Sequence, residues 1–301
     1  MLCAAIDIGS NTTRILVAEP AGGQLKKVME QRAYTRIGKG VDPGDPIADE
    51  KIEEVGLVVA TQVRLARELG AEAFRAVATA AVRESSNSDE FASRVESASG
   101  VPVDVVSEEE EGRLAFIGAT KSLGHPLEGQ IAVVDVGGGS SEVVLGSAAG
   151  GIESVQSWPV GSGMLADQMI SSDPPSASEI RRMRDRIDDL FDGVSIGRPR
   201  QAVAVGGSAT SLRKMVGSML EYETLERSIR LLCGDTAEEV GRKFELDPQR
   251  VRILPSGVLL LEKISDLLGQ PLQIGKGGIR EGIVLDLLNG SENSHRSAAL
   301  V

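Results

Sequence analysis

The sequence predicts an α/β fold made of two domains of related topology. A unit of two apolar, β-branched runs around a glycine-rich turn occurs twice, at residues 4–18 and 131–145. Between and after these units, patterns typical of helices alternate with patterns typical of strands. Hydrophobic residues make up 41% of the 301 residues and charged residues 25%, which are ordinary values for a globular protein with a sizeable core.

The two units align residue by residue, which identifies an internal repeat. Each unit predicts a β-hairpin, because runs of Ile, Val and Ala precede and follow the turn. The equivalent positions include Asp7 with Asp135, Gly9 with Gly137, and Thr12 with Ser140. We therefore expect each domain to open with a strand, a glycine-rich loop and a second strand.

The remaining elements follow in alternating order. In the first half, helices are expected at 48–69, 86–98 and 108–121, and strands at 74–79 and 103–106. In the second half, helices are expected at 178–191, 236–244, 257–268 and 279–288 and from Ala209, and strands at 201–205 and 272–274. A turn cluster at 124–129 marks the boundary. The predicted domains are 1–126 and 127–290, and the polar residues 291–301 are predicted to form a flexible tail.

Charge and composition exclude several classes of protein. Lys and Arg total 32 against 44 Asp and Glu, and the formal net charge of −12 argues against a protein that coats nucleic acid. No apolar run approaches the roughly 20 residues that span a bilayer, and the first residues lack the features of a secretion signal. The two cysteines, Cys3 and Cys233, cannot form a disulfide framework. We expect a cytoplasmic protein without a membrane partner.

Histidine chemistry is nearly excluded as well. The chain has two histidines, His125 before a proline and His295 in the polar tail. A site with three imidazole ligands is therefore impossible, and a Ser-His-Asp triad would have to use one of these two.

The glycine-rich loops have the composition of a phosphate-binding site. Glycine lets backbone N–H groups approach an anion closely, and hydroxyl groups add donors. The candidate residues are Gly9, Ser10, Asn11 and Thr12 in the first loop and Gly137, Gly138, Gly139, Ser140 and Ser141 in the second. A third turn, which includes Gly207 and Ser208, joins a strand to a helix start, where the helix dipole favours anions. The alternative is that all three are only tight turns.

Three carboxylates flank these loops. Asp7 and Asp135 each precede the first glycine of a loop by two residues, and Glu142 follows the second loop. A carboxylate repels phosphate, but Mg²⁺ (or Mn²⁺) takes carboxylate and phosphate oxygens together. We therefore predict that Asp7, Asp135 and Glu142 are metal-binding. Turn capping by the aspartates and a solvent-facing Glu142 are the alternatives.

An acidic run opens the helix expected at 108–121. Ser107 has the pattern of an N-cap, and Glu110, three residues on, completes a capping box. Glu111 is not needed for that box. A carboxylate at a helix N-terminus stays ionised, as a water-activating base must. Glu111 is therefore the candidate base.

Two arginines are placed to bind phosphate. Arg14 follows the first loop, and Arg83 follows the stretch Ala78–Thr79. A guanidinium group can bind two phosphate oxygens at once, which makes arginine suited to phosphate recognition.

Seven stretches occur together in one order, from about residue 4 to 288. They are Ile6–Thr12, Ala78–Thr79 with Arg83 and Asn87, Glu110–Leu114, Asp135–Glu142, Gly206–Thr210, Ile253–Pro255 and Gly278–Gly282. This set resembles the family of exopolyphosphatases and guanosine pentaphosphate phosphatases (Ppx/GppA), a branch of the superfamily that contains actin-like sugar kinases and Hsp70.

The resemblance implies two ribonuclease-H-like (actin-like ATPase) domains with an active cleft between them. It implies an exopolyphosphatase that hydrolyses the terminal phosphoanhydride bond of inorganic polyphosphate and releases orthophosphate, supported by Mg²⁺ or a similar ion. In the family a glutamate orients the attacking water, and this role falls to Glu111, with Glu110 as second choice. Arg83 corresponds to a phosphate ligand, and Asp135 and Glu142 to the carboxylates at the metal.

Two departures from the family pattern modify this expectation. Ser107-Glu108 stands where many relatives have Ser-Gly, which adds charge near the site. Longer relatives also carry carboxy-terminal helical domains that help to hold long chains. We therefore expect a preference for shorter polyphosphate.

Other functions remain open at this point. A guanosine pentaphosphate phosphatase would use the same machinery, with a nucleotide as substrate. A kinase of the same superfamily would need ATP as donor. A non-catalytic sensor would bind guanosine penta- or tetraphosphate, or polyphosphate, without releasing phosphate. A homodimer is expected from apolar faces on the late helices.

Overall fold

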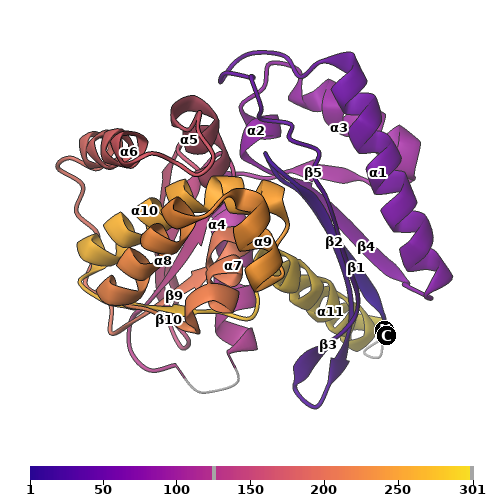
Figure 1. Ribbon diagram of the computed structural model, residues 1–301. Coiled ribbons are helices and arrows are strands. Elements are labelled where there is room, and N and C mark those ends of the chain that lie inside the picture. Colours follow the sequence, from indigo (N-terminus) through magenta and orange to yellow (C-terminus); the bar gives the residue numbers. More distant parts are fainter. Residues whose placement is uncertain (124–126, 299–301) are drawn as a thin grey trace. The chain divides into compact units, whose positions relative to one another are not determined.

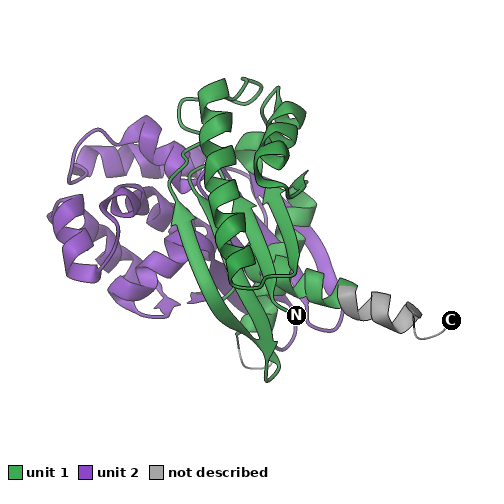
Figure 2. Cartoon of the chain, turned by 90° about the vertical axis from the view of Figure 1, so that its right-hand side faces the viewer, with its two compact units in different colours: residues 1–124, 277–301 green, residues 125–276 purple. Residues whose placement is uncertain are grey.

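The computed structural model describes residues 1–123 and 127–298. The chain divides into two compact units, coloured separately in Figure 2. Unit 1 comprises residues 1–124 and 277–301, and unit 2 comprises residues 125–276. The change from one unit to the other at residue 124 lies beside the predicted boundary, but residues 124–126 are outside the described part of the chain.

Unit 1 contains a five-stranded mixed sheet in the order β3-β2-β1-β4-β5. Its strands are β1 (Cys3–Ile8), β2 (Thr13–Ala21), β3 (Gln24–Ala33), β4 (Ala73–Ala78) and β5 (Val103–Val105). The first three are antiparallel neighbours, and β4 and β5 continue the sheet in parallel with β1. Every residue of β1 except Asp7 is buried, because helices cover both faces of the sheet.

Helices cover the two faces of this sheet in pairs (Figure 1). On one face, Ile6 and Ile8 pack under α1 (Asp49–Glu68) and α3 (Ser88–Ser99). On the other face, α4 (Glu108–Ser122) and α11 (Ile279–Ala298) pack over Cys3, Ala5 and neighbouring apolar residues. The short helix α2 (Ala80–Arg83) follows β4.

Unit 2 contains a six-stranded sheet in the order β10-β11-β9-β6-β7-β8. Its strands are β6 (Ile131–Val136), β7 (Ser141–Ser147), β8 (Gly151–Trp158), β9 (Gln201–Val205), β10 (Met219–Leu220) and β11 (Leu272–Ile274). The helices of this unit are α5 (Ser162–Met169), α6 (Ala177–Leu190), α7 (Gly206–Val216), α8 (Tyr222–Gly234), α9 (Ala237–Phe244) and α10 (Pro248–Leu268). They share one hydrophobic core, in which α10 is central because it packs against all the others.

The internal repeat predicted from the two hairpins is confirmed at the level of topology. Read from its other edge, the second sheet runs β8-β7-β6-β9-β11, which repeats β3-β2-β1-β4-β5 strand for strand. The pairing directions also agree: two antiparallel pairs come first and two parallel pairs follow. Strand β10 is an addition at the edge of unit 2.

The last helix differs from the prediction in two respects. Residues 277–290 were expected in the second domain, but α11 belongs to unit 1, where Ile283 and Val284 complete the core over β1. The helix also extends to Ala298 rather than ending at Leu288, so the predicted tail is helical as far as the described residues reach. Helix α10 likewise begins earlier than expected, at Pro248, a residue favoured in the first helical turn.

No helix in the described part of the chain combines the length and the apolar character needed to cross a membrane.

Candidate phosphate and metal site

The two glycine-rich loops have the same turn geometry. In unit 1 the Gly9 N–H donates to the carbonyl of Thr12 over 3.0 Å, and in unit 2 the Gly137 N–H donates to the carbonyl of Ser140 over 2.9 Å. These are equivalent positions of the repeat. We call residues 9–12 loop A and residues 137–140 loop B.

In loop A, a neighbouring segment holds the carbonyl groups. The Gly38 N–H donates to the Ser10 carbonyl over 2.9 Å, and the Arg36 N–H donates to the Asn11 carbonyl over 3.1 Å. In a planar trans peptide the N–H points away from the carbonyl. The N–H groups of Asn11 and Thr12 therefore point away from this segment, where an anion can accept from them. No sequence pattern predicted that residues 36–38 hold loop A in this way.

In loop B, the start of α5 has the same function. The Ser162 N–H donates to the Gly137 carbonyl over 2.9 Å, and the Gly163 N–H donates to the Gly138 carbonyl over 3.0 Å. A side chain at Gly161 would overlap the backbone of Gly138, so this close approach requires glycine. The N–H groups that follow the two bound carbonyls point away from α5. The pair Gly161 and Gly163 just after β8 is a signal that the sequence analysis missed.

The hydroxyl groups of the predicted phosphate sites divide into two kinds. Those of loops A and B remain candidates, and the Thr12 hydroxyl accepts from the Arg14 Nε over 3.1 Å. Ser141, by contrast, is fully buried and donates to the Val160 carbonyl over 2.7 Å. Ser208 is also fully buried, against Gly257. Both hydroxyls face the interior of unit 2, so these two side chains are not placed to bind phosphate, and a role of the backbone N–H groups of Ser141 and Ser208 stays a prediction.

Two carboxylates lie opposite each other in the hairpin of unit 2. Asp135 on β6 and Glu142 on β7 are direct partners in the strand register, so their side chains lie on the same face of the sheet. Only 3% of Glu142 is exposed, and the Ser157 hydroxyl donates to its Oε1 over 3.4 Å. Glu142 is therefore not the solvent-facing strand residue that the sequence left open.

Asp135 also lies against the first turn of α7. A side chain at Gly206 would overlap the Asp135 Oδ1, and the φ of Gly206 is +81°, a conformation that favours glycine. In the third predicted turn, Gly206 therefore allows α7 to begin directly beside the Asp135 carboxylate.

Asp135 and Glu142 fit a hard divalent cation in part. Among the described residues there is no group of three or more His, Cys, Asp or Glu side chains that could hold a metal by itself. Mg²⁺ is commonly held by one or two carboxylates together with waters and substrate phosphates. The pair of carboxylates therefore suits a cation that binds together with a phosphate substrate.

The equivalent place in unit 1 has a different charge. Asp7 on β1 is the register partner of Arg14 on β2, so a guanidinium stands where unit 2 has the Glu142 carboxylate. Burial and, to a smaller extent, the negative charge of Glu281 raise the pKa of Asp7, and the positive charges of Arg14 and Arg280 act against that rise. Two nearby guanidinium groups oppose the binding of a cation. The structure therefore does not support Asp7 as a metal ligand, contrary to the sequence-based expectation.

Glu111 is bound to Arg83. The Arg83 Nη1 donates to Oε2 of Glu111 over 2.8 Å and to the Val106 carbonyl over 3.1 Å. Both side chains are largely buried, with 17% of Arg83 and 15% of Glu111 exposed. The Arg83 Nη2 is buried without a hydrogen-bond partner among the described residues, although Glu108 lies 3.8 Å away. The structure thus brings the predicted base and a predicted phosphate ligand together.

Glu110, the second choice for the base, has other partners. The Ser107 hydroxyl accepts from the Glu110 N–H over 3.2 Å, which confirms the N-cap. The Glu110 carboxylate does not complete the capping box, however. It accepts from Arg113 Nε over 2.7 Å and from Arg75 Nη2 over 3.1 Å, and these arginines lower its pKa. A carboxylate held by two arginines is a poor proton acceptor, so Glu111 is the better candidate.

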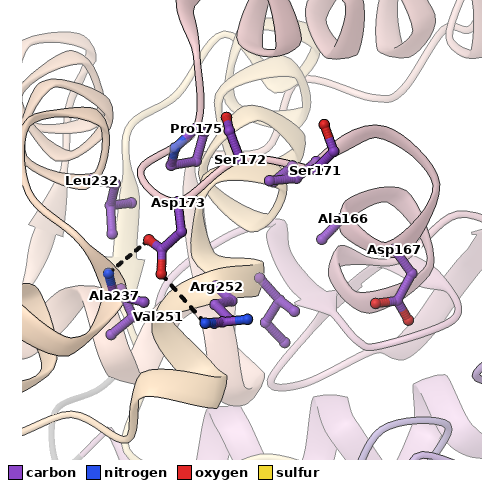
Figure 3. Close-up of a pocket in the computed structure, with 12 residues that line it drawn as sticks. Ala166, Asp167, Ser171, Ser172, Asp173, Pro175, Leu232, Ala237, Val251 and Arg252 are labelled. Atoms are coloured by element: carbon purple, nitrogen blue, oxygen red, sulfur yellow. Dashed lines mark hydrogen bonds and ion pairs between the residues drawn. The ribbon is translucent and has the colours of Figure 1, made fainter.

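Unit 2 also contains a pocket, shown in Figure 3. It has a volume of about 160 Å³ and is formed by α5, the loop after it, α8, α9 and α10. Asp173 at its wall accepts from Arg252 over 3.4 Å and from the Ala237 N–H over 2.8 Å. Loops A and B and the predicted catalytic and metal-binding residues do not contribute to its lining. Asp173 and Arg252 pair with each other, and since none of the predicted site residues lines the pocket, we do not assign it to the candidate site.

Comparisons with known proteins bear on the family and the fold of this chain. The model of the Ppx/GppA phosphatase family matches residues 16–291. An uncharacterized protein of Streptomyces coelicolor is 32% identical over 262 residues, which cover 85% of this chain and 77% of that protein. Exopolyphosphatase 2 of Mycobacterium tuberculosis is 29% identical over 314 residues, which cover 94% of this chain and 98% of that protein.

A solved structure has the same fold over almost the whole chain. The crystal structure of the Ppx/GppA family member of Aquifex aeolicus aligns with a TM-score of 0.80 and 28% identity, over 97% of this chain and 98% of that one. This likeness confirms the predicted class of two actin-like domains. With the family model matching residues 16–291, it establishes that the chain belongs to the Ppx/GppA phosphatase family.

Proposed function

We propose that this chain is an exopolyphosphatase, which hydrolyses the terminal phosphoanhydride bond of inorganic polyphosphate and releases orthophosphate. The observation that carries the proposal is the pairing of Glu111 with Arg83 over 2.8 Å. A carboxylate that orients water and a guanidinium that binds phosphate must lie close together for attack on a phosphorus atom. The name of the Mycobacterium tuberculosis relative, exopolyphosphatase 2, supports the same substrate.

The reaction needs little covalent chemistry from the protein. Glu111 accepts a hydrogen bond from a water molecule and aligns it with the terminal phosphorus. As the new P–O bond forms, the bond to the bridging oxygen breaks, the shortened chain leaves with that oxygen, and the water proton passes to Glu111. The charge that builds on the phosphoryl oxygens is met by Arg83, Arg14 and backbone N–H groups of loop A. Positioning and electrostatics supply most of the rate in such reactions.

A divalent cation fits the carboxylates of unit 2. Exopolyphosphatases generally use such an ion, and we propose Mg²⁺ or Mn²⁺ held by Asp135 and Glu142. When bound, it would neutralise charge on the phosphate oxygens and so lower the repulsion between the substrate and these two carboxylates.

The test is release of orthophosphate in the presence of Mg²⁺. Short polyphosphate, long polyphosphate, guanosine pentaphosphate and ATP are compared side by side, with the wild type and the variants Glu111→Gln and Glu109→Gln. Glu109 is exposed in the same helical turn and is the matched control. We expect release from polyphosphate, fastest from short chains, that falls by at least about a hundredfold in Glu111→Gln only.

Each other outcome has a definite meaning. Release from the guanosine nucleotide alone would make the chain a guanosine pentaphosphate phosphatase. Binding of polyphosphate without release would indicate a sensor. Near-full turnover in Glu111→Gln would show that another group orients the water.

A further inference from the structure

Asp286 on α11 joins two arginines that come from different elements. Its Oδ2 accepts from Arg75 Nη1 on β4 over 3.0 Å and from Arg113 Nη2 on α4 over 3.0 Å. Its Oδ1 accepts from Arg113 Nη1 over 3.2 Å, so the contact with Arg113 is bidentate. Bidentate pairs of this kind fix geometry as well as distance. No sequence pattern predicted a role for Asp286.

The same two arginines converge on Glu110. Arg75 donates from Nη2 over 3.1 Å, and Arg113 donates from Nε over 2.7 Å and from Nη2 over 2.9 Å. Asp286, Arg113, Glu110 and Arg75 therefore form a closed ring. We call these four residues the α4 ring. Its members are only 22–35% exposed, so solvent screens them less than it would an isolated surface pair.

The ring acts on the first turn of α4, where Glu111 also lies. The first turn of a helix lacks intrahelical partners for its N–H groups and frays easily. One of these groups, the N–H of Glu110, donates to the Ser107 hydroxyl. The ring ties the Glu110 side chain to β4 and to α11, so the adjacent Glu111 is held in a fixed place on the unit.

Helix α11 is a rigid support for this purpose. A side chain at Gly118 of α4 would overlap the Gly278 carbonyl, and one at Gly282 of α11 would overlap the Leu114 carbonyl. The two backbones are thus in direct contact at two points. These two contacts fix the first part of α11, one turn before Asp286, relative to α4.

We propose that Asp286 is a positioning residue for Glu111, acting through Arg113, Arg75 and Glu110. The inference rests on the proposed function, because it assumes that Glu111 orients the attacking water. Asp286→Asn removes the charge and keeps the shape. The first turn of α4 loosens, the water is oriented less often, and substrate binding elsewhere is unchanged. We expect kcat for polyphosphate to fall about tenfold with KM unchanged.

A double-mutant cycle separates this role from a general loss of stability. kcat and KM are measured for the wild type, Asp286→Asn, Glu111→Gln and the double variant, and urea unfolding checks that each is folded. If Asp286 acts through Glu111, Asp286→Asn lowers kcat about tenfold in the wild type and by less than about twofold in Glu111→Gln. Asp286→Glu, which keeps the charge, should restore most of the rate.

The matched control is Glu53→Gln. Like Asp286, Glu53 is a carboxylate of unit 1 that pairs with an arginine: its Oε1 lies 3.4 Å from Arg94 Nη2, and other carboxylates surround the same arginine. The variant Glu53→Gln should leave kcat unchanged. If Asp286→Asn does not fold, Arg75→Lys takes its place in the cycle, since it breaks the ring and keeps the charge.

Three results would overturn the inference: an unchanged kcat, an equal loss in both backgrounds, or a change in KM alone. Failure of the proposed function is distinct from these, because the wild type would then release no orthophosphate from polyphosphate. Failure of the assigned base would instead appear as full turnover in Glu111→Gln. The inference would then fall together with the assigned base. An impaired Glu111→Gln with a fully active Asp286→Asn would refute the inference alone.

Discussion

Arg83 and Glu111 are joined by a hydrogen bond of 2.8 Å between Nη1 and Oε2, although 28 residues separate them in the chain. The same Nη1 also donates to the carbonyl of Val106, just after β5. Arg83 therefore fixes both the carboxylate and the segment that leads into α4. An arginine used in this way cannot be exchanged for another cation without loss of geometry.

Replacement of Arg83 by lysine should consequently impair the enzyme although the charge is kept. A single ammonium group cannot hold Glu111 and Val106 and also leave a second nitrogen for phosphate. We expect kcat/KM for polyphosphate to fall about a hundredfold, measured by steady-state release of orthophosphate. Arg64→Lys, at an exposed position of α1, is the control. A loss of less than about threefold would show that only the charge of Arg83 matters.

The second prediction concerns the charge difference between the two hairpins. Asp135 faces Glu142 in unit 2, whereas Asp7 faces Arg14 in unit 1. If the cation is held in unit 2, Asp135→Asn should raise the Mg²⁺ concentration for half-maximal activity by at least about tenfold. Asp7→Asn should leave that concentration unchanged within about twofold, because the guanidinium of Arg14 opposes a cation at that position. Titration of activity with Mg²⁺ measures both, and an equal shift in the two variants would contradict the assignment.

Much of the fold could be predicted from the sequence, because a buried strand or helix leaves a pattern of apolar residues in its own segment of the chain. Both hairpins were predicted, since their strands are buried on two faces and read as continuous apolar runs. Helix α1 was expected at 48–69 and spans Asp49–Glu68. What the sequence could not supply is the partner of each apolar face. The apolar side of α11 would fit either sheet, and only the structure places it over β1.

The same limit applies to the candidate site. The pattern of Ser107 and Glu110 predicts a capping box. The structure confirms one half of it, the hydrogen bond from the Glu110 N–H to the Ser107 hydroxyl. The other half does not form, because the Glu110 carboxylate accepts from arginines instead. One of them, Arg75, lies on β4, 35 residues earlier in the chain. The supports of loops A and B are likewise backbone groups of distant segments, such as Gly38. Backbone hydrogen bonds depend on the path of the chain rather than on residue type, so residue patterns do not reveal them.

The third prediction tests the contact between α4 and α11. A methyl group at Gly118 would overlap the Gly278 carbonyl, and backbone on both sides leaves no flexible side chain that could move aside. Gly118→Ala should lower the free energy of unfolding by about 3 kcal/mol, measured by urea denaturation. Gly234→Ala is the control, because nothing lies within 4 Å of the added methyl group at the end of α8. It should be neutral or stabilising by up to about 1 kcal/mol. Equal effects of the two substitutions would mean that the helices separate without cost.

The last prediction concerns Glu179 in the first turn of α6, which is 3% exposed. Its carboxylate accepts from the N–H groups of Ser171 and Ser176 over 2.7 Å each and from the hydroxyls of both serines over 2.8 Å each. The hydrogen bond from the Ser172 hydroxyl, followed by these bonds, holds the pKa of Glu179 far below its usual range.

A carboxylate with a lowered pKa binds protons more weakly in the folded than in the unfolded state. Its contribution to stability is therefore complete above the unfolded pKa of about 4.3 and is lost as the pH falls below that value. Glu179→Gln should unfold at lower urea concentration than the wild type at pH 7. This difference should shrink steadily between about pH 4.3 and pH 3, as the wild-type carboxylate becomes protonated in the unfolded chain. Glu223→Gln, an exposed position of α8, controls for the loss of one negative charge. A difference that stays constant from pH 7 to pH 3 would show that the serine loop stabilises the fold independently of the charge on Glu179.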